Sequence, residues 1–267
     1  MRDSSLTDAA LAVLSAGLPA DKVRLTDMAA MAWQRGEMTG IGHARPPGRP
    51  ARPDEPPTLP PRQMPKRRLG GENGKIAMLH ALAHIELNAI DLAWDIIVRF
   101  THLAPPKDFF DDWVTVAREE ARHFAALDTL LHQLGSRYGA LPAHDGLWEA
   151  AEKTADDILS RLAVVPMTLE ARALDTAPAT IARLRNDGED AIVAVLDSIL
   201  EDEIGHVATG VRWFTRLCLE TGTDPVQRYQ VTISQHFTKG LKAPFNRAAR
   251  DRAGLRPAFY EPLAGPF

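Results

Sequence analysis

Cysteine is almost absent from this sequence, and its scarcity excludes several classes of protein. Cys218 is the single cysteine among 267 residues. One thiol cannot build a disulfide scaffold, a zinc site of paired cysteines or an iron–sulfur cluster. Hydrophobic residues make up 45% of the chain, the ordinary fraction for a globular protein. The composition therefore predicts a folded protein with a core of normal size.

The chain also lacks a strong excess of charge and a long apolar run. Its 31 basic and 35 acidic residues give a net charge of −4, which argues against nucleic-acid binding by bulk charge. No uninterrupted apolar run reaches the roughly 20 residues that span a bilayer. The segment Met1–Leu18 carries Asp3, Thr7 and Asp8 where a signal peptide would be apolar. We therefore expect a cytoplasmic protein without a membrane partner.

Proline is concentrated in one segment, residues 39–71. Between Arg45 and Arg68 there are nine prolines, seven basic residues and two acidic residues. Proline at this density excludes a helix or a central strand, so we expect an extended strap or linker. Its charge of 7 − 2 = +5 suits either the protein's own acidic surface, which we favour, or a phosphate backbone. The candidates for RNA contact are Arg62, Lys66, Arg67 and Arg68.

The rest of the chain has apolar residues at helical spacing and few alternating runs, so the predicted fold class is all-α. Long helices are expected over 73–101, 107–134, 146–174 and 189–221, which is typical of a four-helix bundle. Shorter helices are expected over 178–185, 226–239 and 246–252, and two more within 4–37. The expected organisation is N-terminal helices and strap over 1–72, the bundle over 73–222, and a helical C-terminal tail packing on it over 223–267.

Two Glu-x-x-His motifs stand on the predicted long helices. Glu120 and His123 lie on the second helix, and Glu203 and His206 lie on the fourth. Residues three apart share one helix face, so each motif directs a carboxylate and an imidazole to the same point. Either motif alone would mean little, because about half an occurrence is expected by chance.

The other two long helices each carry one glutamate in an apolar stretch, Glu86 and Glu170. The two stretches match as apolar-Glu-x-x-Ala-apolar-Asp, and the spacing repeats, with 34 residues from Glu86 to Glu120 and 33 from Glu170 to Glu203. This pattern predicts an internal duplication, two helical hairpins paired about a pseudo-twofold axis. Four buried glutamates are costly without a compensating positive charge, which points to bound metal.

These six residues reproduce the order of ligands in the ferritin-like di-iron carboxylate superfamily, which the sequence resembles over about 74–221. More narrowly, the chain resembles a bacterial ferritin-like family of unassigned function, itself distantly similar to tRNA-hydroxylating di-iron enzymes. That narrower resemblance rests on the segments 143–149, 161–167, 244–246 and 259–263. It implies a bundle of two duplicated hairpins with extra N- and C-terminal helices.

The resemblance also implies two metal ions. One ion would be bound by Glu86, Glu120 and His123, and the other by Glu170, Glu203 and His206. Carboxylate and imidazole ligands favour iron, with manganese as the alternative, and do not exclude zinc.

An acid precedes each Glu-x-x-His motif, Glu119 before Glu120 and Asp202 before Glu203. As in similar enzymes, we expect Asp202 to orient His123 and Glu119 to orient His206, the alternative being that both acids face solvent.

Several further residues have simpler interpretations. His80 and His84 are expected to pack between helices or at the surface, because His84 and Glu86 differ by about 200° around a helix. Asp91 and Asp175, the matching acids of the repeat, predict structural salt bridges with Arg99 or Arg172. Pro166 predicts a kink before Glu170. The five tryptophan and phenylalanine residues expected in the core are Trp94, Phe100, Trp113, Trp148 and Trp213.

Three functions fit this pattern. The first is an O₂-activating oxidoreductase that hydroxylates or oxidises an organic substrate, with tRNA as one candidate. The second is metal handling, either iron oxidation or removal of peroxide by a manganese centre. The third is a binding module with a structural metal, which the duplication disfavours because one ion would suffice. A homodimer is the expected assembly.

Overall fold

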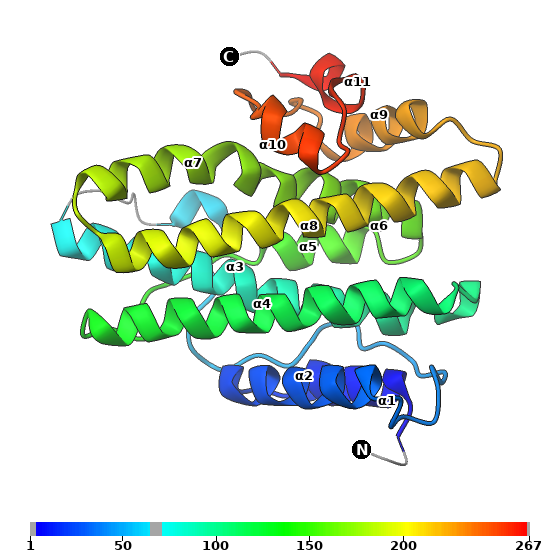
Figure 1. The fold of residues 1–267 in the computed structure, drawn as a ribbon, viewed down its shortest axis with the longest axis horizontal. Coiled ribbons are helices and arrows are strands. Elements are labelled where there is room, and N and C mark those ends of the chain that lie inside the picture. The colour runs from blue at the N-terminus through cyan, green and yellow to red at the C-terminus, as the bar shows by residue number, and fades with distance from the viewer. Residues whose placement is uncertain (1–3, 65–70, 266–267) are drawn as a thin grey trace. The chain divides into compact units, whose positions relative to one another are not determined.

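The computed structural model describes residues 4–64 and 71–265, and these confirm the all-α fold class (Figure 1). Among the described residues no strand forms, and the only β contacts are two isolated bridges, Thr58 with Ala143 and Leu241 with Ala264. The chain divides into two compact units, Met1–Glu149 and Ala150–Phe267. Each unit contains one hairpin of the predicted duplication. The expected ranges 1–72, 73–222 and 223–267 stay a prediction.

The first unit is built on a hairpin of two long helices, α3 (Gly71–Arg99) and α4 (Lys107–Gln133). A short 3₁₀ turn, η2 (Thr101–Leu103), and Pro106 before α4 separate them. Two shorter helices cover the hairpin, α1 (Leu6–Ser15) on α3 and α2 (Pro19–Gln34) on α4. A capping box at Ser5 begins α1, and proline at the first position begins α2. The N-terminal helices thus belong to the same core as the hairpin.

The proline-rich segment forms the expected strap in its described part. Its one regular turn is η1 (Pro61–Gln63). Arg49 pairs with Asp145 at 2.6 Å, and Arg137 reaches Glu55 at 2.7 Å. The described strap therefore lies along acidic and basic groups of its own unit. Lys66, Arg67 and Arg68 lie outside the described residues.

The prediction of one continuous helix over 146–174 is wrong. This segment is divided into α5 (Gly146–Lys153), α6 (Ile158–Val164), a π-helix η3 (Val165–Glu170) and the start of α7 (Ala171–Asn186). Asp157 begins α6 by accepting from the Leu159 amide at 3.0 Å. The buried Arg161 side chain donates to the Ala151 carbonyl at 2.7 Å, so a long-range bond satisfies the end of α5.

The separate helix predicted over 178–185 is also wrong, because α7 continues through Pro178. A proline inside a helix leaves the carbonyl four residues earlier without its amide donor. In this unit the Asn246 side-chain amide donates to the Leu174 carbonyl at 3.1 Å and replaces that bond. The C-terminal tail therefore permits a helix that local pattern alone would break.

The second unit is completed by α8 (Asp190–Glu220), which packs against α7 and the π-helix. The helices α9 (Pro225–His236), α10 (Arg247–Arg252) and α11 (Pro257–Tyr260), with the turn η4 (Glu261–Leu263), form the tail that covers this hairpin (Figure 1). Both units have aromatic cores, and all five of the predicted tryptophan and phenylalanine residues are buried. Cys218 is also buried, as expected.

Among the described residues, α3 is the one helix long and apolar enough to cross a membrane. Most of its apolar window is buried inside the protein, which is the behaviour of a core helix. Length and composition alone are weak evidence for a span. A cytoplasmic location stays a prediction.

Candidate metal centre

The α3–α4 hairpin brings three of the six predicted ligands together. Glu86 comes from α3, and Glu120 and His123 come from α4. His123 Nδ1 lies 3.3 Å from Glu86 Oε2 and 3.4 Å from Glu120 Oε2. One ligand atom from each residue falls within 4.8 Å of the others, and none of the three residues exposes more than 4% of its surface. This buried cluster could hold a metal ion.

Local structure explains how the three side chains converge. Glu120 and His123 are three residues apart, so one face of α4 carries both. Leu87 and Ala121, the residues after Glu86 and Glu120, are also buried, so both helices run through the interior at these positions. The hairpin connection then sets α3 alongside α4, with Glu86 opposite the motif.

The electrostatics of the cluster favour a positive charge. Burial opposes charge on His123, but hydrogen bonds to Glu120 and Glu86 outweigh it and raise the pKa of the imidazole to about 11. Two buried carboxylates therefore hold a proton on the imidazole when no metal is bound. A divalent ion at the same point would replace that proton and neutralise both carboxylates. Carboxylate oxygens with one imidazole nitrogen form a donor set suited to iron or manganese.

The second unit carries the other three predicted ligands in a looser arrangement. Glu203 and His206 lie on α8, and both are buried. His206 Nδ1 is 3.6 Å from Glu203 Oε1. Glu170 ends the π-helix and is half-buried. Within the described part of this unit, Glu170, Glu203 and His206 do not gather as closely as the three residues of the first unit.

The π-helix before Glu170 is where the sequence places Pro166, and single π-turns inside helices are common at functional sites. The Thr168 hydroxyl donates to the Ala163 carbonyl at 2.8 Å, five residues back. The Tyr229 hydroxyl from α9 lies 2.7 Å from Thr168 Oγ1 and 3.3 Å from the Met167 carbonyl. Tyr229 of α9 therefore stabilises the π-helix from a separate element. No sequence motif near Tyr229 predicts this role.

The two acids that precede the motifs, Glu119 and Asp202, are half-buried, and each takes part in an interaction. Neither is a fully solvent-facing side chain. The expected pairs, Asp202 with His123 and Glu119 with His206, join residues of different units and stay a prediction.

The matching acids Asp91 and Asp175 form buried salt bridges, as expected, but their main partners come from outside the hairpins. Lys22 Nζ of α2 is 2.6 Å from Asp91, and both side chains are fully buried. Arg99 does not pair with Asp91, contrary to the expectation, because it is taken by Asp95 at 2.7 Å.

Arg52 of the strap contacts the other oxygen of Asp91 at 3.0 Å. In the second unit, Arg250 of α10 binds Asp175 through two hydrogen bonds of 2.9 and 2.7 Å. Arg172 also reaches Asp175, at 3.2 Å, as predicted. Each terminal segment thus supplies a buried cation to the equivalent acid of its hairpin.

His80 and His84 pack inside the first unit rather than at its surface. His80 Nε2 accepts from the Gly139 and Leu141 amides at 3.0 and 3.3 Å. His84 Nδ1 lies 2.8 Å from the Tyr138 hydroxyl. The two histidines therefore serve the packing between α3 and the loop after α4.

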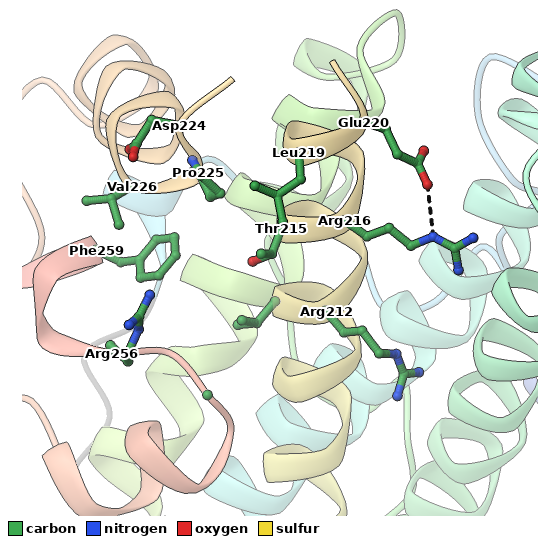
Figure 2. A pocket seen from close by; sticks show the side chains of 12 residues that line it. Arg212, Thr215, Arg216, Leu219, Glu220, Asp224, Pro225, Val226, Arg256 and Phe259 are labelled. Carbon is green, nitrogen blue, oxygen red and sulfur yellow. Dashed lines mark hydrogen bonds and ion pairs between the residues drawn. The ribbon is translucent and has the colours of Figure 1, made fainter. Parts of the chain in front are cut away.

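A hollow of about 630 Å³ in the second unit has a different character (Figure 2). Its floor is apolar, with Leu219 of α8, Val226 of α9 and Phe259 of α11 directed toward it, while Arg216 turns away to bond Glu220 at 2.9 Å. Its lining contains no imidazole or thiol.

Comparison with known proteins places the chain in a family. A family profile described as protein of unknown function, DUF455, matches residues 15–261. The chain belongs to the DUF455 family. It is also 41% identical over 208 residues to an uncharacterized protein of Haemophilus influenzae, covering 76% of this chain and 72% of the relative. No solved structure matches it. The family description states no activity, so the buried cluster of Glu86, Glu120 and His123 is the feature of this DUF455 protein that points to a function.

Proposed function

We propose that this DUF455 protein holds a dimetal centre, with iron as the favoured metal, and acts as an O₂-activating oxidoreductase on an organic substrate. The observation that carries the proposal is the buried cluster of Glu86, Glu120 and His123. Two carboxylates and an imidazole have converged in an apolar interior, where a proton on His123 offsets one of the two negative charges and a divalent cation would offset both. A role in packing alone would be served better by apolar side chains.

The second ion is supported by the duplication. Glu170, Glu203 and His206 repeat the residue types and spacing of the first three ligands. We infer that the two hairpins pair as a ferritin-like bundle, so that each contributes a glutamate and a Glu-x-x-His motif. The π-helix supports this role, since π-turns inside helices are frequent at functional sites and Glu170 is the last residue of this one.

Each group of residues has a definite task in this proposal. Iron bound there would supply the binding and reduction of O₂. The six side chains would hold and neutralise the ions, and the buried surroundings of His123 and His206 would exclude water from them. In the first unit, the proton that His123 carries without metal would leave when the metal binds, so that metal loading should release protons.

Metal analysis of the chain purified from its own host tests the proposal. Glu120→Gln removes one ligand from the first cluster and Glu203→Gln one from the second, each with little change of volume. Glu201→Gln is the matched control, because Glu201 is an exposed residue on α8 beside Glu203. We expect about two ions per wild-type chain, loss of metal in both ligand variants, and full content in the control.

Other outcomes would contradict parts of the proposal. One ion that survives Glu203→Gln would reduce the site to a single-metal cluster in the first unit. No metal in the native protein, with Glu120→Gln equally folded, would remove the proposal altogether. Manganese with rapid peroxide turnover would favour the metal-handling function over O₂ activation.

An RNA substrate rests on the basic strap alone. Of its seven basic residues, Arg49 pairs with Asp145 and Arg52 with Asp91. Contact with RNA would therefore depend on Arg45, Arg62 and the three basic residues that follow Pro65. Changing Arg62, Lys66, Arg67 and Arg68 to alanine should abolish RNA binding and leave the metal content unchanged. Unchanged RNA binding in that variant, or none in the wild type, would remove tRNA as a substrate. A homodimer stays a prediction, to be measured by light scattering.

A further inference from the structure

The first unit contains a cavity of about 340 Å³ that none of the predicted metal ligands lines. The strap residues Arg49–Thr58 form one wall. His84 of α3, Tyr138 and Trp148 form the other. His84 and Glu86 point in directions about 200° apart around α3, so the cavity and the metal cluster belong to different faces of that helix. The volume is at the small end of the range for ligand pockets, about 300–1,000 Å³.

Arg52, a charged residue that lines this cavity, is fixed in place by bonds to Asn88 and Asp91. Arg52 donates from Nη2 to Asn88 Oδ1 at 2.7 Å, and its Nη1 lies 3.0 Å from Asp91 Oδ2. The other oxygen of Asp91 is taken by Lys22 at 2.6 Å. Two cations thus share one buried anion, which leaves this group with a surplus of one positive charge.

The remaining polar groups do not supply the missing anion. The His84 ring is neutral, because burial lowers the pKa of His84 to about 4. Both ring nitrogens have protein partners, since Nδ1 lies 2.8 Å from the Tyr138 hydroxyl and Nε2 lies 3.2 Å from the His144 carbonyl and 3.1 Å from the Asn88 side-chain nitrogen. Asp145 is paired with Arg49 at 2.6 Å, and Asp54 is an exposed residue at the rim.

Trp148 adds a hydrogen-bond donor. Only 2% of Trp148 is exposed, and its indole Nε1 is buried with no hydrogen-bond partner among the described residues. A buried donor without an acceptor costs about 1–3 kcal/mol. Over the whole lining, Asp54 and Asp145 balance Arg49 and Arg52. The positive charge is therefore local to the Arg52 side of the cavity, and Trp148 adds an unused donor beside the apolar rings of the strap prolines.

We propose that this cavity binds a small organic anion, a carboxylate carried on a compact apolar body. Its oxygens accept from the Trp148 indole and the Arg52 guanidinium, and its body packs against Pro50 and Pro53. This binding is independent of the metal centre, so neither proposal depends on the other.

Calorimetric titration of the full chain tests the proposal with three probes: benzoate, the neutral benzyl alcohol of similar size, and inorganic phosphate. We expect benzoate to bind at least about tenfold more tightly than benzyl alcohol, because a charge-assisted bond to a half-buried guanidinium is worth more than a tenfold factor. Benzoate should also bind more tightly than phosphate, which lacks the apolar body.

Two matched variants locate the site. Trp148→Phe keeps the ring and removes the donor, and benzoate binding should weaken about tenfold. Trp113→Phe makes the same change at another buried indole of this unit whose Nε1 has no partner among the described residues and which does not line the cavity. It should bind benzoate as the wild type does. Arg52→Lys keeps the charge, loses the planar fork and should also weaken binding.

Three results would overturn the inference. These are no benzoate binding in the millimolar range, equal affinity of Trp148→Phe and Trp113→Phe, and phosphate binding as tight as benzoate. A thermal unfolding midpoint for each variant shows whether a loss of binding is a loss of fold. Trp148→Phe removes a donor that has no hydrogen-bond partner among the described residues, so it should leave that midpoint unchanged.

Discussion

The close approach of α8 to the π-helix predicts that Gly210 cannot carry a side chain without strain. A β-carbon at Gly210 would lie 2.7 Å from both Cβ and Cγ of Pro166. Carbon atoms pack best at about 3.5–4.0 Å, so the added methyl would be about 1 Å too close to a rigid ring. Overpacking of this kind costs about 1–3 kcal/mol.

Gly205 provides the matched control. It lies on the same helix and is exposed, and a β-carbon added there would meet no described atom within 4 Å. Alanine is favoured over glycine inside a helix by up to about 1 kcal/mol. Gly205→Ala should therefore stabilise the protein by that amount. Gly210→Ala gains the same helix propensity, but the steric overlap of its methyl group with Pro166 offsets that gain. The free energies of unfolding should differ by about 1–3 kcal/mol between the two variants.

Urea unfolding of the two variants and the wild type measures this difference. Equal stability of Gly210→Ala and Gly205→Ala would refute the reasoning, because the overlap with Pro166 is the only term that separates them. If the proposed metal centre is correct, Gly210→Ala should also weaken the metal held through Glu170, since the strain falls on the turn that ends there. Gly205→Ala should keep the wild-type metal content.

Three further outcomes are expected. The pKa of His84 is lowered from 6.5 to about 4 in the folded protein. Between these two pH values the unfolded chain therefore binds more protons than the folded protein. The free energy of unfolding should be highest above pH 6.5 and should fall by up to about 3 kcal/mol as the pH drops to 4. His84→Gln should flatten this part of the plot of unfolding free energy against pH. Lys22→Met removes one of the two cations that share Asp91; because Arg52 still pairs with that carboxylate, the loss in urea unfolding should be that of one bond to a charged group, about 1.5–3 kcal/mol, and no loss at all would contradict the Lys22–Asp91 pairing. Tyr229→Phe removes the hydroxyl beside Thr168 and should cost about 1 kcal/mol, with no change in the far-ultraviolet circular dichroism.

The local sequence pattern was sufficient to predict much of the secondary structure and part of the candidate site. Helical spacing predicted the elements observed as α3, α4 and α8 to within a few residues of their ends. The spacing of three between Glu120 and His123 predicted a shared face, and the buried cluster with Glu86 lies where the sequence placed half of a metal site. These features depend on residues close together in the chain or on one hairpin, so the sequence carries them directly.

Contacts between distant segments decided the rest. The α5–α6 break depends on Arg161 bonding back to Ala151, and α7 passes Pro178 because Asn246 serves the Leu174 carbonyl. The buried cations for Asp91 and Asp175 come from both terminal segments, 69 residues away for Lys22 and 75 for Arg250. Helical periodicity reports which face of a helix is buried, but it holds no information about which distant side chain meets that face. For that reason the ion pairs, the π-helix and the cavity beneath the strap emerged only from the folded chain.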